Sequence, residues 1–309
     1  MSNLKRKYGN RGVENPFNTK GSIDLNLMID IVGKSDIASI GHVVTELLNI
    51  IQDEKSSAKD LKDITSKDPP LCARLLKLAN SVYYGYSRKI SDIQEAIVCI
   101  GFDAMLELAL TQKVCELFVD KEVRPSGFSL VGLWRHSTAV AIFCKMLYRR
   151  EFREKGDDVY AAGLLHDIGI IVEDQTVPTE FERILSESAR KKQKLSVVEK
   201  EILKINHLGI GKALAQNWGF PENLIQAIAF HDNPELADNG SFRFVATVYL
   251  ANYICQQRQV GYIGFQDLDS QYYHILLEKL GVKGKAVEII MDEVIIELGK
   301  LDEKGWFSK

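Results

Sequence analysis

The chain has 309 residues, enough for about two domains, and 46% hydrophobic and 26% charged residues are typical of a globular protein. The formal net charge of -3 excludes a globally basic surface that would attract nucleic acid or anionic membranes. No apolar run reaches the roughly 18 residues of a membrane span, and the N-terminus has no signal-peptide core. These features predict a cytoplasmic protein without a membrane partner.

The first 22 residues are polar and basic, which predicts a disordered tail over residues 1–22. The five cysteines are scattered singly, without a CxxC spacing, and their odd number argues against a complete set of disulfides. We therefore expect reduced thiols, in agreement with a cytoplasmic location. The cysteines are Cys72, Cys99, Cys115, Cys144 and Cys255.

Helical periodicity continues through the first half of the chain, residues 23–125. Apolar residues form one stripe over residues 36–52, and a shorter stripe follows over residues 59–65. Asp68, followed by two prolines, predicts a capped helix start, and Ser91 to Gln94 has the form of a capping box. The break at Pro125-Ser126-Gly127 predicts a boundary between two helical subdomains.

The second half, residues 126–260, is also predicted to be helical. Ser129 precedes a helix with His136 on its apolar face, and residues 160–172 (YAAGLLHDIGIIV) predict one buried helix. Ser196 to Glu199 has the form of another capping box. Further helical patterns end in C-terminal helices within residues 261–309. The whole pattern predicts an all-α fold, because no segment alternates with the period of a strand.

His166 and Asp167 stand at the centre of the apolar run over residues 160–172. A charged carboxylate in such surroundings costs several kcal/mol unless it is paired, protonated or bound to a metal. Two explanations therefore remain open from the residues. The pair is either a hydrogen-bonded structural couple or part of a divalent metal site, for which imidazole and carboxylate are common ligands.

Three further histidines, His136, His207 and His231, fall at helix positions that are predicted to point inward. Each one alone would more often be a hydrogen-bonded core histidine than a ligand. Together with His166 and Asp167 they favour a metal site, because such sites in helical bundles are assembled from several helices. The candidate metal ligands are His136, His166, Asp167, His207 and His231.

These motifs resemble the HD superfamily of metal-dependent phosphohydrolases. WRHS supplies His136, LLHDIG supplies His166 and Asp167, and NHLGIG and FHDNP supply the two later histidines. The resemblance implies a late aspartate as a further ligand, but Asn252 in LANYICQ stands at that place. A neutral amide is a weaker ligand than a carboxylate, which argues against hydrolase activity. The glycine-rich GYP signature of the HD-GYP branch is also missing.

The first half, KDPPLCARLLKLANS to ISDIQEAIVCIG, resembles the HDOD family, the HD-related output domain of bacterial signalling proteins. LWRHS, GLLHDIG, NHLGIGKALAQNWGFP and IAFHD extend this resemblance over residues 37–232. It implies an N-terminal helical bundle, residues 23–125, packed on an HD-like helical bundle, residues 126–260. It also implies a regulatory role in signal transduction.

The leading interpretation is a stand-alone HDOD protein that binds a signalling protein or a small-molecule ligand without catalytic turnover. A metal-dependent phosphohydrolase acting on a nucleotide or cyclic dinucleotide is the alternative, and a buried polar relic without any ligand is a third reading. A retained metal would be iron, manganese or zinc. The basic cluster over residues 190–194 contains no aromatic residue, so no nucleic-acid partner is expected.

Overall fold

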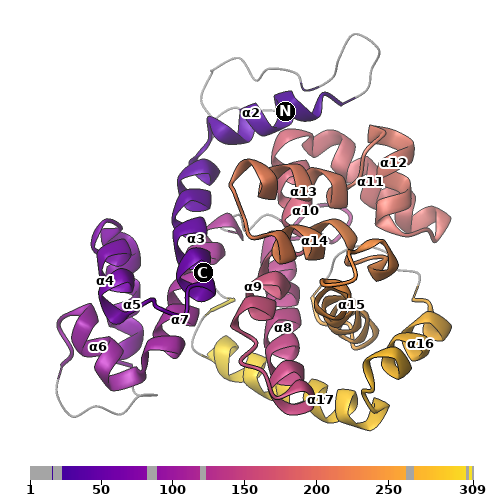
Figure 1. Ribbon diagram of the computed structural model, residues 1–309. Coiled ribbons are helices and arrows are strands. Elements are labelled where there is room, and N and C mark those ends of the chain that lie inside the picture. Colours follow the sequence, from indigo (N-terminus) through magenta and orange to yellow (C-terminus); the bar gives the residue numbers. More distant parts are fainter. Residues whose placement is uncertain are drawn as a thin grey trace.

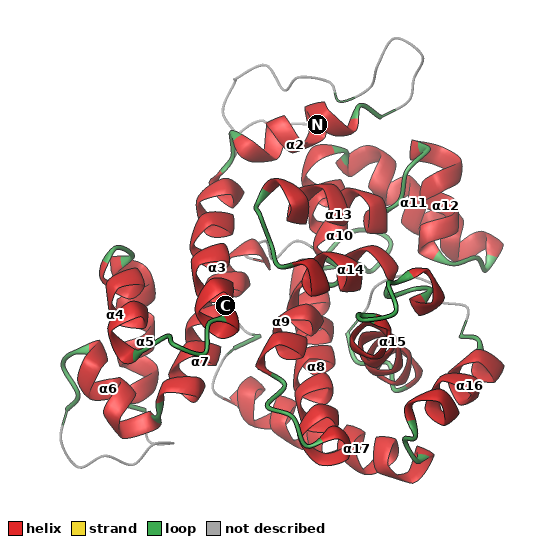
Figure 2. Cartoon of the chain, viewed as in Figure 1, coloured by secondary structure: helices red, strands yellow, loops and turns green. Residues whose placement is uncertain are grey.

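The computed structural model describes residue 16 and residues 23–81, 89–118, 123–261, 268–303 and 306–307. Over these ranges the chain is built from helices and contributes no β-strand (Figure 1 and Figure 2), which confirms the predicted all-α class. None of the described helices is long and apolar enough to cross a membrane. The predicted disordered tail lies outside the described residues except for Pro16.

The first group of helices covers residues 25–118. Its members are α2 (Leu25–Gly33), α3 (Asp36–Gln52), α4 (Ala58–Ser66), α5 (Pro69–Ala79), α6 (Ile93–Ile100), α7 (Phe102–Val114) and the 3-10 turn η1 (Cys115–Phe118). The predicted cap of α5 is confirmed, since the Asp68 carboxylate accepts a hydrogen bond from the backbone N–H of Leu71. The cap of α6 is Asp92 rather than the predicted Ser91.

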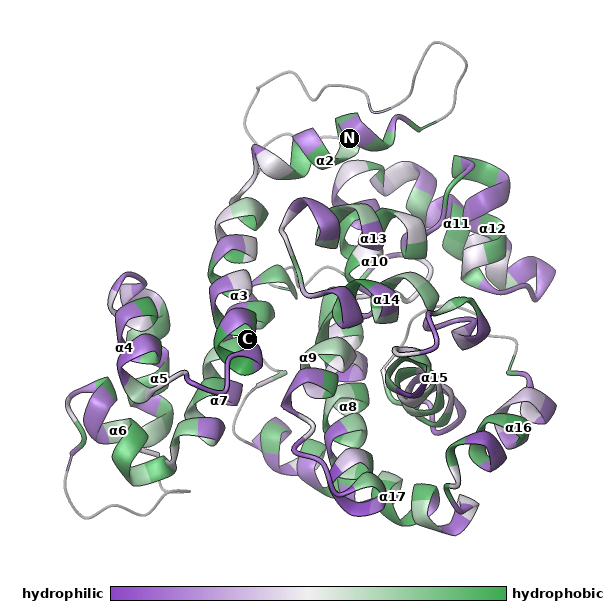
Figure 3. Cartoon of the chain, in the orientation of Figure 1, coloured by the Kyte–Doolittle hydropathy of each residue, from purple (hydrophilic) through white to green (hydrophobic). Residues whose placement is uncertain are grey.

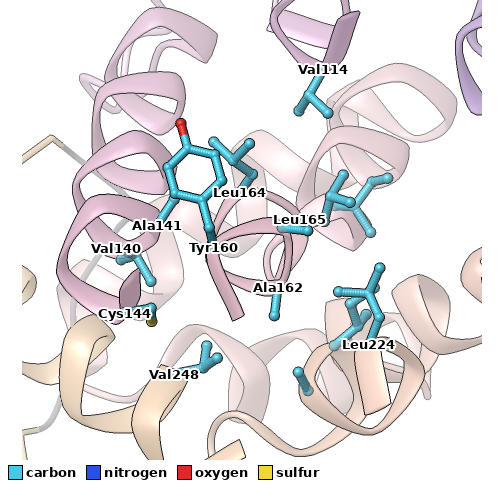
Figure 4. Packing of buried hydrophobic residues seen from close by; sticks show 14 of the residues in the cluster. Val114, Val140, Ala141, Cys144, Tyr160, Ala162, Leu164, Leu165, Leu224 and Val248 are labelled. Atoms are coloured by element: carbon cyan, nitrogen blue, oxygen red, sulfur yellow. The ribbon is translucent and has the colours of Figure 1, made fainter. Parts of the chain in front are cut away.

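The second group covers residues 130–257. It consists of α8 (Leu130–Leu147), the π-helical turn η2 (Tyr148–Phe152), α9 (Asp157–Leu165), α10 (Ile168–Thr176), α11 (Pro178–Lys191), α12 (Leu195–Leu203), α13 (His207–Asn217), α14 (Glu222–Phe230), η3 (Pro234–Leu236) and α15 (Phe242–Gln257). α9 is central, and every residue over 159–165 is buried. Figure 4 shows side chains of α7, α8, α14 and α15 around this helix.

Two further helices complete the described chain, α16 (Ser270–Leu280) and α17 (Gly284–Glu303). α16 packs against α15, and α17 packs along α8. The buried face of α17 carries apolar residues at helical spacing, namely Val287, Ile290, Met291, Val294 and Leu298. In Figure 3, which is coloured by hydropathy, α15 is mainly hydrophobic, whereas α4 and α16 alternate between hydrophobic and hydrophilic residues.

The predicted single helix over residues 160–172 is wrong at its centre. α9 ends before His166 and α10 begins after Asp167, whose φ of -97° and ψ of 19° depart from helical values. The His166 Nδ1 lies 2.9 Å from the carbonyl oxygen of Gly163. That carbonyl would accept the N–H of Asp167 in a continuous helix, so the imidazole replaces a backbone hydrogen bond.

Two glycines let helices that carry the candidate ligands approach one another closely. A Cβ added to Gly163 of α9 would lie 2.5 Å from the Cα of Ala141 in α8. A Cβ added to Gly169 of α10 would lie 2.0 Å from the backbone oxygen of His207 in α13. Any other residue at either position would force the two backbones apart. The spacing of the helices around residues 166 and 167 therefore depends on these glycines.

Two well-defined contacts are among those that join the first group of helices to the second. The hydroxyls of Thr111 in α7 and Tyr160 in α9 are 2.9 Å apart in a buried contact. The indole ring of Trp218 covers Gly41 of α3. A Cβ added to Gly41 would lie 2.3 Å from that ring. The hydroxyl of Thr45 donates a hydrogen bond to the Trp218 carbonyl at 3.1 Å. These contacts fix the N-terminal helices against the helices of the candidate site.

Candidate metal centre

Asp167 is the centre of a buried polar cluster formed by the ends of four helices. Its Oδ2 lies 3.1 Å from the Nε2 of His166, and its Oδ1 lies 3.3 Å from the Nε2 of His231. The Nε2 of His207 is 3.7 Å from the same Oδ1. All four residues are at most 5% exposed. The structure thus brings four of the five predicted ligands around one point.

Backbone carbonyls orient two of these imidazoles. His166 at the end of α9 has its Nδ1 on the carbonyl of Gly163, and His231 at the end of α14 has its Nδ1 3.2 Å from the carbonyl of Ile228. A carbonyl only accepts hydrogen bonds, so each Nδ1 carries the proton. In the neutral imidazole the Nε2 then offers a lone pair toward Asp167, which is the tautomer that binds metals in this orientation.

His207 is the first residue of α13 and is held by a carboxylate. The Glu199 side chain accepts hydrogen bonds from the backbone N–H of His207 at 2.9 Å and from its Nδ1 at 2.7 Å. Burial alone lowers the pKa of His207, but the negative charge and hydrogen bond of Glu199 outweigh it and raise that pKa to about 9. The Nε2 of His207 faces the Asp167 Oδ1 at 3.7 Å and carries a proton at neutral pH, which a metal ion would have to displace.

The gap between His166 and Asp167 fits a cation. The His166 Nε2 and the Asp167 Oδ2 are both buried, and neither has a hydrogen-bond partner among the described residues. Two lone pairs that face each other at 3.1 Å repel, and each atom has lost its water. A divalent ion bound between them would remove both penalties. Imidazole and carboxylate together suit iron, manganese or zinc.

The electrostatics of Asp167 agree with this donor role. Burial by itself raises the pKa of this carboxyl, but positive charge and hydrogen bonds from the His166 and His231 imidazoles in their protonated form overcome that effect and hold the pKa well below its usual range. The carboxylate is therefore ionised at neutral pH. Two three-residue groups offer ligand atoms within 4.8 Å of one another, and Asp167 belongs to both; they are His136, His166, Asp167 and Asp167, His207, His231.

His136 lies beside the cluster but uses its nitrogens differently. Its ring centroid is 5.5 Å from that of His166, its Nδ1 lies 3.1 Å from the Val260 carbonyl, and its Nε2 lies 3.0 Å from the Asn252 side-chain amide. Burial, and next the neighbouring His166, lower the pKa of His136 to about 4, so the ring is neutral at pH 7. The structure places the Oδ1 of Asn252 against this Nε2, so the single N–H of the neutral ring donates either to that amide oxygen or to the Val260 carbonyl.

The Oδ1 of Asn252 therefore lies against the nitrogen that His136 could offer to a metal. The same Oδ1 accepts a hydrogen bond at 2.6 Å from the Nε2 of Gln256, one turn later on α15. The predicted ligand His136 thus reaches the site, whereas its nitrogens are engaged in a hydrogen-bonded chain.

Sequence reasoning missed two acidic residues of the site, Glu173 and Glu199. Ser196 to Glu199 reads as a capping box, but α12 begins at Leu195 and the Glu199 carboxylate holds His207 instead. Glu173 is fully buried with both carboxylate oxygens unpartnered among the described residues. Burial and the negative charge of Glu199 raise the pKa of Glu173 well above its usual range. The sequence did offer one signal for Glu173, because it is an acidic residue inside the mainly apolar stretch of residues 168–177.

The cluster is closely packed on its open side. A cavity of about 10 Å³ touches Asp167, His207 and His231, and a second cavity of about 20 Å³ continues toward Lys194 and Tyr253. A single water molecule requires roughly 10–15 Å³ by the same measure. Among the described residues, each cavity beside the cluster therefore has room for about one ion or one water molecule.

The comparisons with known proteins identify the domain in which these residues lie. The HDOD domain profile matches residues 37–234, which include all five histidine and aspartate positions of the predicted site. The chain belongs to the HDOD family. The match ends before Asn252, so the amide that binds His136 lies outside the segment that defines HDOD proteins.

Solved structures of similar proteins have the same fold. An HDOD domain protein of unknown function from Geobacter sulfurreducens is 26% identical, covers 84% of this chain and 90% of its own, and has a TM-score of 0.71. A Marinobacter aquaeolei protein, provisionally described as a signal transduction protein, is 22% identical over 91% of this chain and 61% of its own, with a TM-score of 0.71. A Shewanella amazonensis protein with a provisional phosphohydrolase name is 24% identical over 92% of this chain and 96% of its own, with a TM-score of 0.64.

Two curated sequences are also similar to this HDOD chain. An uncharacterised protein of Treponema pallidum is 26% identical over 222 residues, which is 70% of this chain and 42% of that protein. The uncharacterised protein YuxH of Bacillus subtilis is 25% identical over 130 residues, which is 34% of this chain and 32% of YuxH. The chain thus spans less than half the length of either curated relative.

Proposed function

We propose that the chain is a regulatory protein of signal transduction in which the Asp167 cluster holds one divalent metal ion without catalytic turnover. His166, Asp167, His207 and His231 would hold the ion, which would be iron, manganese or zinc. His136 would act as a neighbour that is hydrogen bonded to Asn252. A bound ion would supply positive charge and Lewis acidity to this buried site.

The enclosure of the cluster is the observation that carries this proposal. The two cavities beside it have volumes of about 10 and 20 Å³. A site for a drug-sized or nucleotide-sized ligand is larger, roughly 300–1,000 Å³. A nucleotide therefore has no room beside Asp167 in this arrangement of the described residues. The same space suits an ion that stabilises the ends of four helices.

The pairing of Asn252 with His136 supports the same conclusion. A hydrolase with two metal ions needs additional ligands on the far side of His166. At that place the nitrogens of His136 face the Val260 carbonyl and the Asn252 amide. One complete ligand set remains around Asp167, and the second is blocked by hydrogen bonds. The phosphohydrolase alternative rests on the unpartnered His166 and Asp167 atoms, which would serve either function.

The wider proposal concerns compartment, partners and organisation. All five cysteines are scattered thiols outside any disulfide, which supports the reducing bacterial cytoplasm. The partner would be a signalling protein or a small-molecule ligand rather than nucleic acid or a membrane. The functional units would be an N-terminal bundle over residues 23–125, the HD-like bundle over residues 126–260 and C-terminal helices over residues 261–309.

The test compares His231→Gln with His42→Gln, a matched substitution on an exposed side chain. Purified wild type and both variants are measured for metal content by elemental analysis and for thermal stability with and without added iron, manganese or zinc. We expect near-stoichiometric metal in wild type and in His42→Gln, and a loss in His231→Gln because one ligand is gone. The circular dichroism spectra of all three proteins should agree.

The same preparations are then assayed for hydrolysis of cyclic di-GMP, nucleoside triphosphates and deoxynucleotides with each metal supplied. We expect no turnover by any of them. Metal-dependent hydrolysis by wild type that is lost in His231→Gln would establish the phosphohydrolase alternative. Wild type without metal and without a metal-induced rise in stability would favour the buried polar relic.

A further inference from the structure

A separate cavity of about 500 Å³ lies between the two groups of helices. Its walls come from α7, α8, α9 and α17, and the remaining lining residues are Leu78 of α5, Ser81, Arg149 of η2, Lys155 and Trp306. The volume falls within the range of small-molecule sites, roughly 300–1,000 Å³. The cavity shares no lining residue with the small cavities beside Asp167. It is therefore a second, larger space in the molecule.

Seven of the lining side chains are apolar. Five of these pack against the described core, namely Leu108 of α7, Ile142 and Met146 of α8, Leu301 of α17, and Trp306. Trp306 adds an indole ring at the C-terminal end of α17. An aromatic or branched aliphatic body would bury its surface against these side chains, which is the usual source of affinity in such sites.

The polar groups deep in the cavity are already held in place. Lys145 is 14% exposed and makes ion pairs with both Glu107 and Asp157. The hydroxyl of Tyr160 is paired with that of Thr111. The two acidic groups are thus occupied by Lys145, and this network forms a rigid polar wall.

Arg149 and Lys155 are the polar groups of the cavity that remain available for an anion. Both are exposed and line the cavity, and neither has an ion pair or hydrogen bond with another described residue. Of the remaining acids, Glu297 pairs with Lys300, and Asp103 lies exposed on α7. Two unpaired cations beside an apolar wall are suited to an anionic head group on an apolar body.

We propose that this cavity is a binding site for a small amphipathic anion. The ligand would have an aromatic or branched aliphatic body between α7, α8 and α17, and a carboxylate, sulfonate or phosphate group at Arg149 and Lys155. Two walls of this site are α8, which carries His136, and α9, which ends at the residue before His166. The proposal does not depend on whether the Asp167 cluster binds a metal or catalyses a reaction.

The test uses the aromatic sulfonate 8-anilinonaphthalene-1-sulfonate as the probe, because its fluorescence rises in an apolar site. Full-length wild type is titrated at low and high salt. The first variant, Ala104→Trp, fills the cavity from an exposed position on α7. The second, R149E/K155E, reverses both cations. The matched control, K283E/K285E, makes the same change in charge at exposed lysines next to and within the start of α17, away from the cavity lining.

We expect one saturable site in wild type with affinity that falls as salt rises, because the head group is held by charge. Ala104→Trp and R149E/K155E should each weaken binding by roughly tenfold or more, while K283E/K285E binds as wild type does. Circular dichroism, thermal unfolding and metal content should match wild type in every variant. No saturable binding, equal loss in the control, or full binding by either cavity variant would overturn the proposal.

Discussion

Substitution of Gly163 by alanine should destabilise the protein through the crossing of α8 and α9. The added Cβ would lie 2.5 Å from the Cα and 2.6 Å from the backbone nitrogen of Ala141. Carbon atoms pack best at roughly 3.5–4.0 Å, so the helices must separate by about 1 Å. Both clashing atoms belong to a backbone, so no side-chain rotation can relieve them.

The expected magnitude follows from two opposing effects. Alanine in place of glycine inside a helix gains roughly 0.5–1 kcal/mol from lower backbone entropy in the unfolded chain. Overpacking of a core costs roughly 1–3 kcal/mol, and more when backbones must move. The free energy of unfolding of Gly163→Ala should therefore fall by about 1–2 kcal/mol. His136 on α8 and His166 after α9 should also shift apart.

Gly299→Ala is the matched control, because Gly299 lies within α17 and an added Cβ there would meet no atom within 4 Å. It should raise the free energy of unfolding by roughly 0.5–1 kcal/mol. Urea denaturation followed by circular dichroism, at matched metal content, measures both changes. The two substitutions should shift the midpoint in opposite directions. A Gly163→Ala protein as stable as wild type would refute the close approach of α8 and α9.

Three further predictions concern charge and the candidate ligands. Burial raises the pKa of Asp68, but hydrogen bonds from Lys113 and the backbone lower it further, so its contribution is present above the ordinary value of 3.8 and disappears as pH falls below it. Asp68→Asn keeps the cap but should lose roughly 1–3 kcal/mol of stability at pH 7, and progressively less as pH falls below 3.8, in urea titrations. A loss that does not change over this pH range would contradict the prediction. Glu199→Gln should weaken metal binding about 10- to 100-fold in chelator competition, because His207 loses its charged partner. An unchanged affinity would contradict this prediction. Asn252→Asp should strengthen metal binding in the same assay without creating turnover, and a weaker affinity would count against the proposed site.

Local signals predicted much of the fold. Apolar stripes at helical spacing locate helices such as α3, because a buried helix face needs those residues whatever its neighbours are. Asp68 followed by two prolines marks the start of α5, because the capping bond spans only three residues. The all-α class follows from these patterns alone.

Longer-range hydrogen bonds explain what the sequence could not reveal. Glu199 looks like a helix-capping residue in its own segment, and its partner His207 stands 8 residues later. The break at His166 is invisible in the continuous apolar run, because it depends on where one imidazole nitrogen points. The order of the motifs predicted the candidate ligands, whereas the engagement of His136 by Asn252 required the packing of α8 against α15.

The contact of α3 with Trp218 has a consequence for synthesis of the protein on the ribosome. Thr45 and Trp218, joined by a hydrogen bond, are 173 residues apart in sequence. Chains elongate at about 5–20 residues per second, so α3 emerges roughly ten seconds or more before its partner exists. During that interval the apolar surface at Gly41 has no native cover. Chaperones that shield nascent chains should therefore act mainly on this N-terminal segment.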